Sequence, residues 1–223
     1  MSFQAIDIEV RLPDKARRAS VSYSAKKPMA EVTLTLENGR SREIVVPTRV
    51  GRALQAEGIP LPQDEDGAFD AIHALEGRIC LTMLTEMLSR RDHGTEEARR
   101  KLALYGFRDS EIDAALTRAG ELRFLDDDRF VSYFIEERKR RGWGRRKVEA
   151  ELKRRGIDLE TVDGWPNAFF SDDDDLTRAR ELLARRPIPA SNAFEKMVRR
   201  LMSKGFSYAI ASQAVRGHID ESL

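Results

Sequence analysis

Apolar and polar residues alternate with a period of two near the start of the chain. The apolar members of the first alternating run are Ile6, Ile8, Val10 and Leu12. In a strand this spacing places successive apolar side chains on one face, so we predict a half-buried strand over residues 6–12. Val21 and Tyr23 begin a second run of the same kind.

The dipeptide Asn38-Gly39 separates two further alternating runs, at residues 32–36 and 44–46. It favours a two-residue type I′ turn, in which both central residues have positive φ. We therefore predict a hairpin here, followed by a short helix that ends at Gly58.

The proline-containing, acidic stretch over residues 60–67 indicates a linker, and the pattern becomes helical after it. Apolar residues then recur every three or four positions in two successive runs, first at Phe69, Ile72, Leu75 and Ile79 and then at Leu81, Leu84 and Leu88. This period predicts an amphipathic helix. Two shorter helices follow in our prediction, one ending at Gly106 and one over residues 110–122 with Asp109 as its N-cap.

A leucine, three further residues, a glycine and a large apolar residue occur in this order three times. The copies begin at Leu102, Leu152 and Leu201, and their glycines, Gly106, Gly156 and Gly205, are 50 and 49 residues apart. Glycine adopts the left-handed conformation after a helix at the least cost. The sequence therefore predicts three helices that end in the same way.

These patterns predict a mainly α protein, in which three tandem three-helix repeats form an elongated, curved array after a small β-rich N-terminal module. One unit of about 45–50 residues has a marginal core, and stacking it on its neighbours buries more apolar surface. The predicted domains are the β-rich module with its hairpin, residues 1–68, and three repeats, residues 69–125, 126–171 and 172–223.

Charge is balanced over the whole chain but concentrated in its middle. The 223 residues include 39 basic and 38 acidic side chains, for a net charge of +1. Residues 138–155 alone hold ten basic and two acidic side chains, a net charge of +8. Such a cluster has two interpretations. It forms a positive face that binds phosphates or the acidic surface of another protein, or it is a solvated helix face whose charge is balanced by the aspartates at 126–128 and 172–175.

The other polar residues have structural interpretations. The aspartate runs precede predicted helices, where carboxylates cap free N–H groups and favour the helix dipole. Trp143 packs in a turn or stacks on a base. We expect His93 to be a surface residue of a turn and Cys80 to be a buried, inert thiol. Arg138 and Glu151 could pair across adjacent helices.

No catalytic or nucleotide-binding motif stands out in the sequence, so we predict neither an enzyme nor a cofactor or metal site. A single cysteine fits a reducing compartment. The chain shows neither a signal peptide nor an apolar run of about 18 residues. We therefore expect a soluble, cytoplasmic protein.

The middle repeat closely resembles the signature of the RecX regulatory family. The matching residues are the stretch 124–130, then Phe134, Arg138, Gly142-Trp143-Gly144, Arg145-Arg146, Val148, Glu151-Leu152 and Arg155-Gly156-Ile157. Weaker matches in the flanking repeats extend the resemblance over residues 75–218, and the hairpin resembles an extension found in some members. Gly94 and Ala98 depart from the serine and leucine usual in the family.

The resemblance implies a non-enzymatic negative regulator of the RecA recombinase, with a role in DNA repair, homologous recombination and the SOS response. Such proteins bind in the groove of the RecA filament on single-stranded DNA, lower its ATPase and strand-exchange activity and favour disassembly. We expect a monomer that contacts DNA directly or through RecA, with no membrane partner. The expected contact residues are Arg138, Lys139, Arg141, Arg145, Arg146, Lys147, Lys153, Arg154 and Arg155.

Two other interpretations stay open at this point. One is a helical-repeat nucleic-acid-binding protein without RecA specificity, whose binding of naked nucleic acid would fall steeply with salt. The other is a small hydrolase or transferase on a helical scaffold, for which the sequence offers no clustered catalytic set.

Overall fold

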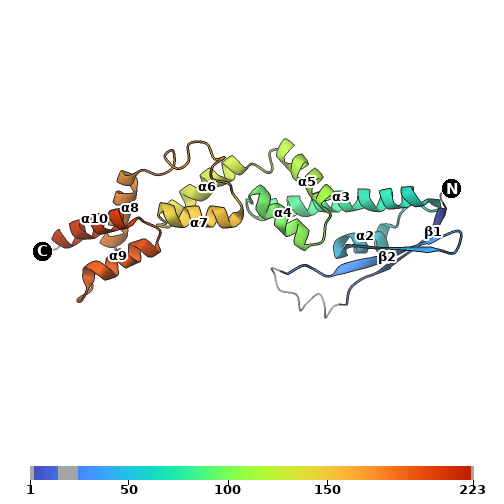
Figure 1. The fold of residues 1–223 in the computed structure, drawn as a ribbon, viewed down its shortest axis with the longest axis horizontal. Coiled ribbons are helices and arrows are strands. Elements are labelled where there is room, and N and C mark those ends of the chain that lie inside the picture. The colour runs from blue at the N-terminus through green and yellow to red at the C-terminus, as the bar shows by residue number, and fades with distance from the viewer. Residues whose placement is uncertain (1–2, 15–24, 222–223) are drawn as a thin grey trace. The chain divides into compact units, whose positions relative to one another are not determined.

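The computed structural model describes residues 3–14 and 25–221. The chain forms two compact units, unit 1 over residues 1–126 and unit 2 over residues 127–223, and Figure 1 shows the elements of each. The strand predicted to begin at Val21 and Tyr23 lies outside the described residues.

In its described residues, unit 1 begins with an antiparallel sheet and a short helix. The elements are β1 (Gln4–Arg11), β2 (Met29–Leu36), β3 (Ser41–Pro47), α2 (Thr48–Glu57) and β4 (Gln63–Asp64). The strand order is β3-β2-β1-β4, and α2 packs on the sheet with Val50 and Leu54 buried. The β-rich start and the short helix are therefore as predicted, and α2 ends at Gly58, which has a φ of 68°.

A β-bulge changes which side chains of β1 face the core. The register with β2 shifts between Ala5 and Asp7, and a bulge of this kind moves the preceding residues to the opposite face. Ala5 is consequently buried, whereas Ile6 is 51% exposed. The strand was predicted correctly, but the assignment of Ile6 to the apolar face was wrong.

The predicted hairpin forms, but with a different turn. The Gly39 N–H donates to the Leu36 carbonyl at 2.9 Å, and the Leu36 N–H donates to the Arg40 carbonyl at 2.8 Å. Gly39 has a φ of 77°, whereas Asn38 does not adopt a positive φ. This is a three-residue loop, a type I turn followed by a left-handed glycine, so only one residue needs positive φ.

Three helices complete unit 1: α3 (Glu65–Arg90), α4 (Thr95–Leu104) and α5 (Asp109–Glu121). Helix α3 starts earlier than predicted, because most of the acidic stretch is not a linker. Gln63 and Asp64 pair with β1, and the Asp64 carboxylate accepts a hydrogen bond from the Gly67 N–H at 2.7 Å. The acidic residues thus cap the helix and occupy its first turn, where they favour the dipole.

A buried carboxylate fixes the start of α5. Glu76 of α3 is 2% exposed, and it accepts hydrogen bonds from the Arg108 backbone N–H at 3.0 Å and from Arg108 Nε at 3.1 Å. Arg108 is the N-cap residue of α5 and Asp109 lies in its first turn, so the predicted Asp109 cap was wrong. A side chain from a distant helix satisfies the free N–H instead.

Cys80 is fully buried in the core of unit 1, as predicted. Burial raises the pKa of its thiol to about 12, so the reactive thiolate is scarce near neutral pH. We expect iodoacetamide at pH 8 to leave Cys80 unmodified in the native protein and to alkylate it rapidly in guanidinium chloride. Mass spectrometry measures both rates, and equal rates would contradict the burial.

The secondary structure of unit 2 is helical, with an irregular segment over residues 157–170 between the second and third of its helices. Its helices are α6 (Asp127–Arg140), α7 (Arg145–Arg155), α8 (Asp172–Ala184), α9 (Ala193–Ser203) and α10 (Tyr208–Asp220). Helices α6 and α7 share a core with the irregular segment 157–170, whereas α8, α9 and α10 form a second core. The division of the helical part into three repeats stays a prediction.

The three repeated glycines all adopt the left-handed conformation, as predicted. Their φ values are 89° at Gly106, 89° at Gly156 and 98° at Gly205. In each case the N–H of the next residue donates to the carbonyl of the repeated leucine, from Phe107 to Leu102, from Ile157 to Leu152 and from Phe206 to Leu201. This is the bonding pattern of a helix that ends on a left-handed glycine.

Candidate functional site

The basic cluster occupies the end of α6, the turn 141–144 and helix α7, all within unit 2. Helix α6 ends like the repeated leucine helices. Gly142 has a φ of 77°, and the Trp143 N–H donates to the Arg138 carbonyl at 3.0 Å. The turn brings the basic end of α6 next to the basic helix α7.

Two of the nine predicted contact residues pack on the Phe134 ring. The Arg138 and Arg155 guanidinium carbons lie 4.6 and 5.1 Å from the centroid of the Phe134 ring. Their side chains are only 16% and 18% exposed. Cations over aromatic faces stabilise the packing by about 0.5–2 kcal/mol. Arg138 and Arg155 therefore hold α6 against α7.

Lys139 and Trp143 are also partly buried. The Lys139 Nζ lies 5.0 Å from the Phe170 centroid and 3.1 Å from a Glu136 carboxylate oxygen. Arg138 and Lys147 both lie over the Trp143 ring, at 5.0 and 4.3 Å from its centroid. These contacts support the interpretation of Trp143 as a packing residue of the turn.

Three further predicted contact residues are exposed but paired with acids. Arg141 pairs with Glu137, Lys153 with Glu149 at 2.8 Å, and Arg154 with Glu151 at 2.6 Å. Burial raises the pKa of the Glu151 carboxyl, but hydrogen bonds from Arg154 and Arg155 outweigh it and leave that pKa below its usual range. Exposed pairs of this kind contribute little to stability, and they lower the local positive charge.

Arg145 and Arg146 differ from the other seven predicted contact residues. Both are exposed, and within the described part of the chain neither forms an ion pair. Together with Lys147 they fill the first turn of α7, which holds no acidic residue. Cations at a helix N-terminus oppose the helix dipole, and a local conflict of this kind is typical of functional positions.

The N-terminus of α7 is seated on the turn between α9 and α10. The Gly144 N–H donates to the Lys204 carbonyl at 2.8 Å, and the Arg146 N–H donates to the Gly205 carbonyl at 3.0 Å. A Cβ added to Gly144 would lie 2.5 Å from the Gly205 carbonyl carbon. Two glycines thus let two backbone segments meet, which orients the first turn of α7.

Arg178 of α8 supports the turn 141–144, a role that no pattern in the sequence indicated. Its Nη1 donates to the Trp143 carbonyl at 2.8 Å, and its Nη2 pairs with Asp175. Asp175 is 6% exposed. Burial raises its pKa, with Arg178 opposing that rise. Ser171, not an aspartate, accepts the capping hydrogen bond of α8, and the run 172–175 fills its first turn. The predicted capping by this run was therefore wrong, whereas its place at the positive end of the helix dipole is as predicted.

His93, expected on the surface, is 4% exposed. Its Nδ1 lies 3.4 Å from a Glu97 carboxylate oxygen. Burial raises the pKa of Glu97, but the neighbouring His93 and Arg91 outweigh burial and hold that pKa far below its usual range. The turn thus places His93 inside the fold, beside a carboxylate of α4.

The described residues contain no cluster of three or more side chains able to hold a metal ion. None of the helices in that part of the chain is long and apolar enough to cross a bilayer.

Comparison with known proteins relates this site to one family. The family model described as "RecX, second three-helix domain" matches residues 126–164, which include all nine predicted contact residues. A regulatory protein RecX from Chromobacterium violaceum is 30% identical over 153 residues, which cover 67% of this chain and 97% of the relative. The chain belongs to the RecX family of regulatory proteins. The predicted resemblance is thereby confirmed.

Other RecX proteins agree with this assignment. A RecX from Thermobifida fusca is 32% identical over 171 residues, covering 74% of this chain and 90% of the relative. The crystal structure of RecX from Lactobacillus salivarius has a TM-score of 0.55 at 16% identity, covering 65% of this chain and 97% of that chain. A second RecX crystal structure has a TM-score of 0.55 at 14% identity and covers 94% of this chain and 97% of that chain. Both structures share the fold, and the relatives are named as regulatory proteins, not as enzymes.

Proposed function

We propose that this RecX-family protein is a negative regulator of the RecA recombinase. It binds the RecA filament on single-stranded DNA, inhibits its ATPase and strand-exchange activity and promotes filament disassembly. The observation that carries the proposal is that the family match falls on residues 126–164, the segment that holds the basic cluster. The chain acts without catalysis of its own, in the cytoplasm and as a monomer.

The side chains at the start of α7 make the principal contact in this proposal. Arg145, Arg146 and Lys147 present three positive charges on one helical turn, suited to DNA phosphates or to an acidic surface of RecA. The Gly144 and Arg146 backbone N–H groups already donate to carbonyls of the α9–α10 turn. Side chains, not the helix N–H groups, therefore carry the binding.

The remaining predicted contact residues take supporting roles. Arg138, Lys139 and Arg155 hold the cluster together through the aromatic rings of Phe134 and Phe170. Arg141, Lys153 and Arg154 become available when the bound anion replaces their carboxylate partners. Three tandem repeats, over residues 69–125, 126–171 and 172–223, would place further surfaces along the filament groove.

RecA ATPase on single-stranded DNA tests the proposal directly. We expect the purified protein to inhibit hydrolysis when it is at most one tenth of the RecA concentration, because one molecule on a filament affects many RecA subunits. Binding to naked single-stranded DNA is measured across a salt series in parallel. Steep salt-dependent DNA binding without ATPase inhibition would favour the alternative, a helical-repeat nucleic-acid-binding protein without RecA specificity.

A further inference from the structure

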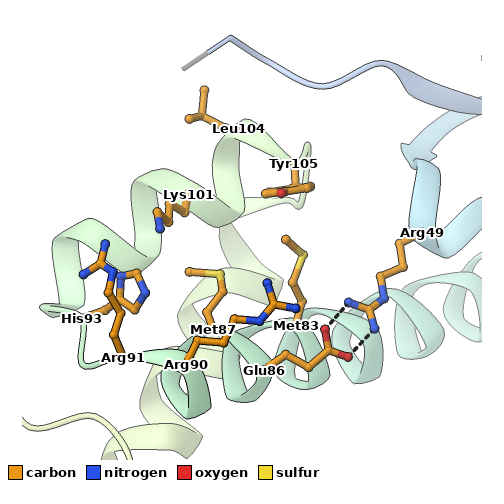
Figure 2. A pocket seen from close by; sticks show the side chains of 10 residues that line it. All are labelled: Arg49, Met83, Glu86, Met87, Arg90, Arg91, His93, Lys101, Leu104 and Tyr105. Carbon is orange, nitrogen blue, oxygen red and sulfur yellow. Dashed lines mark hydrogen bonds and ion pairs between the residues drawn. The ribbon is translucent and has the colours of Figure 1, made fainter. Parts of the chain in front are cut away.

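A cavity in unit 1 has no role in the interface described above. It encloses about 480 Å³ between α3, α4 and the start of α2. Figure 2 shows the ten side chains that line it. Cationic and apolar groups share this lining, and the combination indicates which kind of ligand it fits.

The polar part of the lining is positively charged. Four cations, Arg49, Arg90, Arg91 and Lys101, line the cavity together with one carboxylate, Glu86, and Arg91 also pairs with Glu97 outside this lining. Arg49 Nη1 and Nη2 lie 2.8 and 2.5 Å from the two oxygens of Glu86. The hydrogen bond from Arg49 holds the pKa of Glu86 below its usual range, and the charge of Arg90 contributes. A carboxylate thus occupies the position at Arg49 that an external anion would take.

The apolar part of the lining is formed by Met83, Met87, Leu104 and Tyr105. Tyr105 is 39% exposed, and its ring lies on the cavity side of α4 in Figure 2. An exposed tyrosine ring provides a face on which a nucleobase can stack.

A second cavity adjoins the first and shares part of its lining. It encloses about 210 Å³, and Lys27 and Arg52 add two cations to its lining. Arg49, Met83 and Tyr105 line both cavities, so the tyrosine stands between two hollows, each of which has its own basic residues. A compact ligand would need only one hollow, whereas an extended chain of phosphates with a base between them would use both.

We propose that these adjoining cavities bind a short stretch of single-stranded nucleic acid. Arg90 and Lys101 contact phosphates on one side of Tyr105, Lys27 and Arg52 contact phosphates on the other, and a base stacks on the tyrosine. Cations alone would also suit an acidic peptide, but the aromatic and thioether groups between them favour a base. The inference deepens the proposed function, because it gives the N-terminal module a share in binding the DNA of the filament.

The test measures binding of the full chain to a fluorescent thymidine dodecamer, without RecA. We expect Tyr105→Leu to weaken binding about fivefold or more. We expect Arg90→Ala with Lys101→Ala to lower the slope of log affinity against log salt by about 1.4, because each phosphate contact on a single strand contributes about 0.7. Glu86→Gln frees Arg49 and strengthens binding about two- to fivefold.

Matched controls separate the site from general charge and folding effects. Tyr208→Leu replaces another exposed tyrosine, and Glu121→Gln removes an exposed carboxylate that is also paired with an arginine, Arg118. Both should bind like the parent protein. Circular dichroism confirms that each variant is folded. Photocrosslinking of an iodouridine-labelled oligonucleotide should mark Tyr105.

Two outcomes would overturn the inference. Tyr105→Leu and the Arg90 and Lys101 double variant could bind the dodecamer within twofold of the parent protein. Alternatively, these variants could lose binding only of a glutamate decamer, which would assign the cavities to an acidic peptide. The dodecamer assay contains no RecA, so its result stands even if the protein fails to inhibit the RecA ATPase. Conversely, a loss of the cavity proposal does not change the outcome of the RecA assay.

Discussion

Gly205→Ala should destabilise unit 2 by about 2–5 kcal/mol, because it combines backbone strain with overpacking. Gly205 has a φ of 98°, and an added Cβ would lie 2.5 Å from the backbone nitrogen of Lys147. The added Cβ would meet backbone atoms, which cannot move aside as the end of a flexible side chain can. The α9–α10 turn would have to separate from the start of α7, and the two hydrogen bonds across that contact would be lost.

Gly144→Ala isolates the overpacking, since the φ of −85° at Gly144 suits any residue. We expect it to cost about 1–3 kcal/mol. Gly142→Ala is the control. Its φ of 77° gives a comparable backbone strain, but its Cβ would meet only the end of the Leu182 side chain, which can move. We therefore expect about 1–2 kcal/mol from strain alone.

Guanidinium denaturation followed by tryptophan fluorescence measures these differences, because both tryptophans, Trp143 and Trp165, lie in unit 2. An unchanged midpoint for Gly144→Ala would show that the two backbone segments do not meet as described. Glycine is required on either side of Trp143 for two different physical reasons. One ends a helix, and the other permits contact with a neighbouring turn.

Reversing the charge of the two exposed arginines in the first turn of α7 should abolish the proposed regulation without harming the fold. We expect Arg145→Glu with Arg146→Glu to raise the concentration needed for half-inhibition of the RecA ATPase more than tenfold, since each charge-assisted contact contributes about 1.5–3 kcal/mol. Acids in the first turn of α7 favour the helix dipole, by about 0.3–1 kcal/mol each. The variant should therefore be at least as stable as the parent protein.

The control reverses two exposed arginines elsewhere in unit 2, Arg199→Glu with Arg200→Glu. It changes the net charge by the same amount and should retain inhibition. If the α7 variant inhibits RecA like the parent protein, the binding surface lies elsewhere. If both variants fail equally, the net charge of the unit decides binding and the position of the arginines does not.

The predicted interface illustrates what a charge pattern omits. All nine contact residues were chosen for charge and proximity, but the structure gives them different surroundings. Arg138 and Arg155 pack on Phe134, because a planar guanidinium loses little by lying over an aromatic ring. Arg145 and Arg146 stay exposed. A sequence shows which residues are basic, but not which of them pair with acids of their own helix and which pack on rings of another segment.

Local chemistry explains what the sequence alone determined about this protein. The left-handed glycines after the repeated leucines, the hairpin at Gly39 and the buried Cys80 depend on residues near one another in the chain. Their geometry follows from side-chain size, backbone freedom and periodicity. The family resemblance rests on the same local motifs, which is why it was visible before the fold was known.

Only the tertiary structure decided the features that join distant segments. The bulge that exposes Ile6 depends on the pairing of β1 with β2. Glu76 reaches the start of α5 from α3, and Arg178 of α8 holds the Trp143 turn. The contact between Gly144 and Gly205 joins the start of α7 to the turn between α9 and α10. Each depends on which backbone groups remain unsatisfied once the chain is packed, and that is settled in three dimensions, not by the order of residues.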